Sequence, residues 1–313
     1  MSYRTTNAFQ SVELEDSIKE LHRAVGNAVA DEKHMVFATG SMQLINALVY
    51  ALSPDSYSGS TAGVVATSPY YPDYRTSTVM FDSRESRWEG NTATWANASA
   101  KSKDIIEFVT SPNNPDALLR QPLQLSQHRS TFSRIVLHTT RACRWALIRD
   151  EKVANKVNDY VLQNTMGASR DTQLRMLNIF KVMLANLRSK EDIFAFGRDV
   201  MTAKWRKLNA VVSRSRRISL QKIPPQYCTY FDRIREPSPA YASVKCEREE
   251  DGDCFDMLLK AKIITRTGVW SEASSRYTRI SLLKSQDDFD MLLERVTELV
   301  DAENYSVPGS SSM

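Results

Sequence analysis

A strand, a tight turn and a helix follow one another early in the chain, and this order constrains the fold most. The apolar run 35–38 meets the Thr-Gly-Ser turn 39–41, after which apolar residues recur at helical spacing as far as Pro54. Two further β-rich runs, at 63–67 and 105–110, each end in a proline-containing loop. Strands that alternate with helices predict an α/β fold with a mainly parallel sheet.

The remaining segments predict helices around this sheet and a smaller α+β part at the C-terminal end. Helices are expected over 12–30, 153–164, 172–188, 192–213, 253–260 and 286–300, and strands over 241–246, 262–266 and 277–283. In the first helix, Leu14, Ile18, Leu21, Val25 and Val29 share one apolar face. We expect an N-terminal segment with its helix (1–30), a large domain (31–190), a small α+β domain (191–306) and a disordered tail (307–313).

The composition is that of an ordinary folded protein. Of 313 residues, 42% are hydrophobic and 25% charged, near the globular averages of about 45–50% and about 25%. The net charge of +4 is too small to predict a nucleic-acid partner. No apolar stretch is long enough for a membrane span, and none follows Met1 as a signal peptide would. We expect a cytoplasmic protein, or a vacuolar or secretory one if the N-terminus is incomplete.

The four cysteines predict no metal site. Cys143, Cys228, Cys246 and Cys254 lack the CxxC spacing of zinc ligands, and the few histidines have no spaced partners. Cys246 and Cys254 are the closest pair and flank an acidic loop. Their separation is compatible either with a local disulfide or with two free thiols, because separation alone does not fix the geometry of a bridge.

Three segments at strand ends could carry chemistry. The helix start at 39–41 offers backbone N–H groups and a positive helix dipole to a phosphate, although an ordinary N-cap looks the same. Tyr70, Tyr71 and Tyr74 could stack on an aromatic ring or simply pack. The loop 111–116 could bind a ligand at a carboxyl strand end, or form a plain Asn-Pro turn.

In this order the three segments resemble the fold-type I pyridoxal-phosphate (PLP) enzymes, in particular the plant alliinase and tryptophan-aminotransferase-related family. The resemblance covers nearly the whole chain and includes 44–54, 68–74, 110–116, 145–148, 227–231, 272–281 and 286–290. The last two of these are closer to alliinase. The family implies the fold-type I transferase fold, PLP as cofactor, a homodimer, and a small amino-acid substrate. The reaction would be carbon–sulfur lysis or transamination.

The resemblance also implies roles for matching residues near the three segments. Gly40, Ser41 and Met42 would hold the cofactor phosphate. Tyr71 would stack on the pyridine ring, and Asn114 would hydrogen-bond the ring hydroxyl. We expect the helix start, Tyr71 and Asn114 to converge within about 15 Å, because a ring with its phosphate spans less than that.

Further roles fall on residues outside those segments. Arg279 would grip the substrate carboxylate, which a guanidinium can bind through two parallel hydrogen bonds. Tyr3 resembles a tyrosine that the family sends across the dimer interface towards the cofactor phosphate. The alliinase-like resemblance further implies that Cys246 and Cys254 face each other, with Cα atoms within about 7 Å.

The chain departs from the family between residues 117 and 144. Arg134 stands where the Schiff-base lysine belongs, and a guanidinium stays protonated and cannot attack the cofactor aldehyde. The phosphate-binding arginine is replaced by Ala142, with Arg144 nearby but out of register. The stretch 121–134 is too short for the family's strand and contains no Asp to pair with the pyridine nitrogen.

Nucleophile, electron sink and phosphate anchor are therefore missing together, so no catalytic residue is intact. We expect a recognisable cofactor cleft with impaired cofactor binding and little or no turnover. The alternative is a pseudoenzyme or a truncated splice or gene-model form that acts only as a dimeric scaffold. Sequence alone leaves the origin of the loss open.

Overall fold

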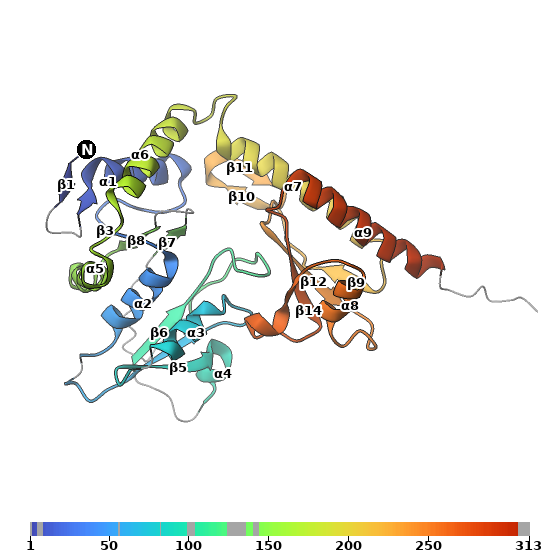
Figure 1. The fold of residues 1–313 in the computed structure, drawn as a ribbon, viewed down its shortest axis with the longest axis horizontal. Helices are drawn as coiled ribbons and strands as arrows, with labels where there is room; N and C mark the ends of the chain where they lie inside the picture. The colour runs from blue at the N-terminus through green and yellow to red at the C-terminus, as the bar shows by residue number, and fades with distance from the viewer. Residues whose placement is uncertain are drawn as a thin grey trace, which may run out of the picture.

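The computed structural model describes residues 2–4, 9–55, 57–81, 83–98, 104–123, 136–139 and 144–305 (Figure 1). Within these ranges the chain forms α/β layers in its first half and an antiparallel sheet with helices in its second half. The predictions for Arg134, Ala142 and the tail 307–313 lie outside the described residues. No helix in the described part of the chain is both long and apolar enough to span a membrane.

One three-stranded sheet is parallel throughout. Its middle strand β4 (Ala62–Ala66) pairs with β5 (Ser86–Asn91) on one side and with β6 (Asp104–Phe108) on the other. Every residue of β4 is buried, as expected for a strand covered on both faces. Helices α3 (Asp73–Met80) and α4 (Thr92–Ala96) connect these strands.

The second three-stranded sheet is antiparallel, a pairing that the sequence did not predict. The strands β3 (His34–Ala38), β8 (Arg144–Ile148) and β7 (Val136–Thr139) lie in the order β3-β8-β7. Four residues separate β7 from β8, whereas a parallel pair needs a crossover of about a dozen or more residues. The antiparallel pairing of β7 with β8 follows from that short connection.

Helices cover both faces of this sheet (Figure 1). α1 (Val12–Val25) and α6 (Arg170–Ala185) pack on one face, and α2 (Ser41–Leu52) and α5 (Glu151–Thr165) pack on the other. α1 ends earlier than predicted, because Gly26 adopts a left-handed φ of 70°. Val29 therefore lies beyond the helix and is 73% exposed, so its predicted place on the apolar face was wrong.

The C-terminal half is built on one four-stranded antiparallel sheet. Its strands, in spatial order, are β13 (Arg266–Thr267), β14 (Tyr277–Ser281), β12 (Tyr241–Cys246) and β9 (Ile218–Leu220). The helices of this half are α7 (Ile193–Val212), α8 (Cys254–Lys260) and α9 (Gln286–Tyr305). The strand predicted over 262–266 was wrong except at Arg266, because β13 begins there.

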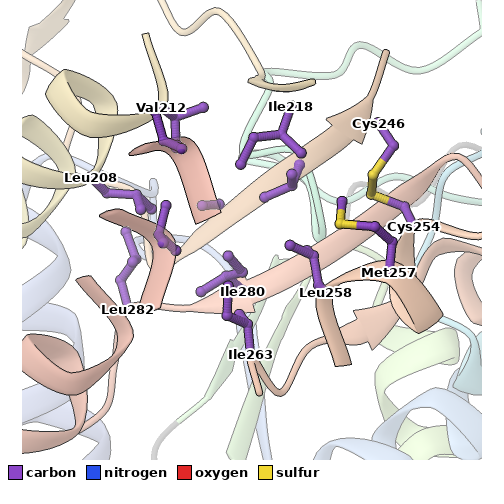
Figure 2. Close-up of a cluster of buried hydrophobic side chains, with 14 of the residues drawn as sticks. Leu208, Val212, Ile218, Cys246, Cys254, Met257, Leu258, Ile263, Ile280 and Leu282 are labelled. Carbon is purple, nitrogen blue, oxygen red and sulfur yellow. A yellow bond between two sulfur atoms is a disulfide. The ribbon is translucent and has the colours of Figure 1, made fainter. Parts of the chain in front are cut away.

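A single hydrophobic cluster fills the space between this sheet and its helices (Figure 2). Leu208 of α7, Leu258 of α8 and Leu282 after β14 are fully buried in it. At the edge of the cluster Cys246 and Cys254 form a disulfide with Cα atoms 5.5 Å apart, which confirms the predicted pairing (Figure 2). Cys228 is a free thiol.

Two small antiparallel ribbons complete the described structure. β1 (Tyr3–Arg4) pairs with β2 (Gln10–Ser11), and β10 (Gln226–Cys228) pairs with β11 (Arg233–Arg235). Two 3₁₀ turns, at Thr229–Phe231 and Gly268–Ser271, lie between elements of the C-terminal half. Neither ribbon was predicted, because each strand has only two or three residues and shows no alternation.

Candidate cofactor and substrate site

The start of α2 presents an open helix N-terminus at the carboxyl end of β3. Gly40 is the N-cap residue and is extended, with no side chain to cap the helix. A Cβ atom at Gly40 would meet nothing within 4 Å, so the space in front of this turn is open. In the described structure no hydrogen bond engages the backbone N–H groups of Ser41 or Met42. Such groups, with the helix dipole, fit a phosphate.

Arg144 lies beside this helix start and was not among the predicted site residues. It begins β8 and pairs in register with Ala38, two residues before Gly40. Burial, with help from the Asp73 carboxylate, raises the pKa of Tyr71 to about 12, while the positive charge of Arg144 acts in the opposite direction. Arg144 is therefore close enough to Tyr71 for their charges to interact. The antiparallel register of β3 and β8 is the signal that could have found it.

The three tyrosines of the 68–74 loop differ in their surroundings. Tyr70 is 2% exposed and packs against Trp88, and Tyr74 stacks on Phe108 with ring centroids 4.3 Å apart. For these two, packing is the observed role. Tyr71 is half-buried, and it meets Tyr74 and Trp270 with nearly perpendicular rings. Of the three, Tyr71 is thus the residue suited to contact a ligand.

The two asparagines of the 111–116 loop make different contacts: Asn113 stabilises the loop itself, and Asn114 contacts Arg279. The Asn113 side chain is buried, and its Nδ2 donates to the Pro69 carbonyl at 2.8 Å and to Asp116 Oδ1 at 3.0 Å. Asn114 is directed elsewhere, because its Oδ1 accepts a hydrogen bond from Arg279 Nη1 at 2.7 Å. The loop is therefore both an Asn-Pro turn and the support of a side chain that reaches β14.

Arg279 contacts residues of both halves of the molecule. Its guanidinium lies over the Tyr241 ring, 4.2 Å from the centroid, and Asn114 holds one of its terminal nitrogens. Burial lowers the pKa of Arg279, although an arginine remains charged. Its Nε is buried and has no hydrogen-bond partner in the described structure. An unsatisfied buried donor of this kind favours an anion as the missing partner.

Contacts between the 68–71 loop and residues 270–272 hold Tyr71 near Arg279. Ser68 Oγ donates to the Glu272 carbonyl at 2.6 Å, and the Tyr70 N–H donates to the Ser271 carbonyl at 3.2 Å. The ring of Trp270 reaches Tyr71 with centroids 6.3 Å apart. The 68–71 loop is thus fastened to the segment that leads into β14 and Arg279.

The predicted site residue Tyr3 belongs to the small N-terminal ribbon. It lies in β1, and the Arg170 guanidinium sits 4.9 Å from the centre of its ring. Its role across a dimer interface stays a prediction. In the described ranges there is no group of three His, Cys, Asp or Glu side chains that could hold a metal ion.

The described residues fit the contacts that PLP makes without a covalent bond. The open α2 start fits a phosphate, Tyr71 offers a ring, and Asn114 offers an amide, all at strand ends of the α/β half. Position 134, where the covalent lysine would stand, lies outside the described residues.

Comparison with known proteins gives the same family for nearly the whole chain. The allinase family model matches residues 1–132 and 127–300. Alliin lyase of Allium cepa is 40% identical over 97% of this chain and 70% of its own length. Tryptophan aminotransferase-related protein 3 of Arabidopsis thaliana is 37% identical over 94% of this chain and 70% of its own length.

The same comparisons show that the chain lacks part of the family sequence. The alignment with alliin lyase of Allium cepa is 337 positions long against 313 residues here, so at least 24 positions of that relative have no counterpart. The family-model match is itself in two parts, which meet at 127–132. This is the region in which the sequence predicts a missing unit.

Solved structures support the fold. Aspartate aminotransferase from Thermus thermophilus matches with a TM-score of 0.67 at 15% identity, over 95% of this chain and 84% of that one. An Escherichia coli protein with a methionine aminotransferase function matches with a TM-score of 0.67 at 12% identity, over 95% of this chain and 86% of that one. The chain has the fold-type I transferase fold and belongs to the alliinase family of PLP-dependent enzymes.

Proposed function

We propose that this chain binds PLP without a covalent bond and has little or no turnover. The observation that supports the proposal is the hydrogen bond between Asn114 and Arg279 beside Tyr71, together with an arginine, Arg134, at the lysine position. PLP supplies an aldehyde and an electron-withdrawing ring when bound. Gly40, Ser41 and Met42 would hold its phosphate, Tyr71 its ring and Asn114 its hydroxyl.

The substrate class follows from Arg279. Its Nε lacks a hydrogen-bond partner in the described structure, and its guanidinium lies over the Tyr241 ring. This arrangement suits the carboxylate of a small amino acid. The residues present can bind and orient such a substrate. Proton transfer at the substrate carbon needs a base near the bound amino acid, and Arg134 cannot serve because it does not lose its proton.

A longer form of this chain is the second candidate. The two-part family match and the missing alignment positions favour a protein that, with the absent block restored, acts as a carbon–sulfur lyase or a transaminase. The present chain would then be its truncated splice or gene-model form. We further propose a homodimer and a division into a large domain (31–190) and a small domain (191–306), as the family resemblance implies.

Direct measurement of PLP binding tests the proposal. We expect saturable binding of PLP, followed by ultrafiltration and by quenching of tryptophan fluorescence, that is fully reversed by dialysis. Replacing Tyr71 by Ala should weaken binding roughly tenfold, about the value of one aromatic stacking contact. Tyr57→Ala is the matched control, because that ring is fully exposed and follows the C-terminal end of α2, whereas the phosphate site is at the N-terminal end of that helix. Failure to bind, or equal weakening by both variants, would reject the site.

A further inference from the structure

A cavity of about 560 Å³ lies between the loops 68–69 and 115–118 and one face of the C-terminal sheet. The sheet side of the cavity includes Ser243 and Lys245 of β12, Arg279 of β14, and Arg266 of β13. The size is that of a small-molecule site, which typically measures about 300–1,000 Å³. Because the cavity shares Arg279 with the proposed substrate site, a ligand held by Arg279 can extend into it.

Two arginines stand opposite each other in this wall. Arg266 and Arg279 are register partners in the antiparallel pair β13–β14, so their side chains leave the same face of the sheet. The positive charge of Arg266 acts on Arg279, which shows that the two cations are near neighbours. Like charges directly opposite destabilise a sheet unless something compensates them.

The other charges around the cavity are already paired. Asp116 binds Arg120 at 2.6 Å, and Lys245 binds Glu247 at 2.6 Å. The remaining lining carboxylate, Glu272, lies 3.6 Å from Arg75. These pairs leave the two opposed arginines as the charges that a ligand would meet.

Neither arginine has a carboxylate partner in the described ranges. Around Arg279 are Asn114 and the Tyr241 ring, and its Nε is unsatisfied. Arg266 rests on the Trp270 ring, 4.6 Å from the centroid, and that ring in turn contacts Tyr71. A guanidinium held on an aromatic face keeps its outer N–H groups available for an anion.

We propose that Arg266 and Arg279 together bind a small dicarboxylate, with one carboxylate on each guanidinium. The preferred amino acid or oxo acid would then carry an acidic side chain, and Arg266 would be the residue that selects it. The inference rests on the proposed function only for the role of Arg279 as the carboxylate site. It does not require PLP to be bound.

Calorimetric titration of the full chain without PLP tests this inference. The probes are succinate, which has two carboxylates, and butyrate, a monocarboxylate of the same carbon count. We expect succinate to bind about tenfold more tightly than butyrate, as one additional charge-assisted contact would give. Arg266→Gln should bring that ratio to about one with butyrate affinity unchanged, and Arg279→Gln should weaken both acids.

Lys245→Gln is the matched control, because it removes one positive charge from the same wall but one that Glu247 already neutralises. We expect it to leave the succinate preference intact. Equal affinity of the wild-type chain for both acids, binding of neither, a preference that survives Arg266→Gln, or an equal loss in Lys245→Gln would each overturn the proposal. Failure of the proposed function shows separately, as absence of PLP binding with the succinate preference retained.

Discussion

The two halves of this molecule differ in the continuity of their sheets and of their match to the family. The C-terminal half has one continuous four-stranded sheet over one hydrophobic cluster, with a disulfide at its edge. In the described ranges the α/β half has two separate three-stranded sheets and a two-stranded ribbon, with several smaller hydrophobic clusters. The family match is interrupted in that half, between β6 and β7.

If the proposed function holds, the difference teaches that catalysis can be lost from one half of a fold while the binding residues remain. Arg279 belongs to the C-terminal half, and Tyr71 and Asn114 precede the interruption, so the binding residues stay together. By the family resemblance, the lysine and the acid that the chemistry needs would belong to the interrupted region. Under the proposed function, the interruption removes the reaction, whereas each half keeps a hydrophobic core of its own.

The largest structural effect is expected at the disulfide of the C-terminal half. Replacing Cys246 and Cys254 together by Ala should lower the free energy of unfolding by about 2.5 kcal/mol, the loop-closure value for their separation. Chemical denaturation of the oxidised protein measures it. Cys228→Ala is the control, since that thiol is free and should change little. Equal stability of the double variant and the control would show that the bridge does not stabilise this half.

Acid should destabilise the α/β half through His22. The His22 ring is 3% exposed, it accepts a hydrogen bond from Trp145 Nε1 at Nε2 (3.0 Å), and its Nδ1 lies 2.9 Å from Asn27 Oδ1. Burial lowers the pKa of His22 below its usual 6.5. The unfolded chain therefore binds the proton first, so stability is complete above pH 6.5 and falls as the pH drops below it.

Urea unfolding between pH 5 and 7.5 measures that effect. The slope from this one group should stay below about 1.4 kcal/mol per pH unit and should disappear in His22→Gln. His34→Gln, at an exposed ring of β3, should keep the slope. A slope unchanged by His22→Gln would assign the acid sensitivity to other groups.

The smallest effect is expected at Ala117, after the 111–116 loop. Ala117 has a φ of 58°, in the left-handed region that glycine adopts without a steric penalty. Ala117→Gly should therefore stabilise the protein by about 1 kcal/mol. Thermal unfolding measures it, with Ala98→Gly, at an exposed position outside any helix or strand, as the comparison. A loss of stability in Ala117→Gly would show that the left-handed backbone at this position is not strained by the Cβ atom of alanine.

Local sequence patterns predicted the helices and strands whose apolar residues recur regularly. The helices at 153–164, 172–188, 192–213 and 286–300 and the strands at 35–38 and 241–246 were confirmed within a few residues. β5 was missed because four of its six residues are polar or charged, and β9 was missed because it has only three residues. The α/β fold with a parallel sheet was confirmed, but the antiparallel pairing of β3, β8 and β7 was not predicted, since strand pairing depends on contacts between distant segments rather than on local periodicity.

For the site, the family motifs predicted residues that the structure brings into mutual contact, as with Asn114 and Arg279. The motifs indicated Arg144 only as an out-of-register neighbour of the phosphate-binding position, and its place beside the α2 start follows from the register of β3 and β8. They could not indicate Arg266, because it becomes significant only when β13 pairs with β14. Their roles, like those of Gly40, Ser41 and Met42, stay predictions.

Borohydride reduction after mixing with PLP, followed by peptide mapping, tests the central claim most directly. We predict that no single lysine becomes labelled stoichiometrically in the wild-type chain, that no absorbance band of a lysine-bound cofactor appears, and that turnover of amino acids is absent. Arg134→Lys should restore little, because the acid for the ring nitrogen and the phosphate arginine would still be missing. One lysine labelled stoichiometrically in the wild-type chain, together with measurable lyase or transaminase turnover, would contradict the account.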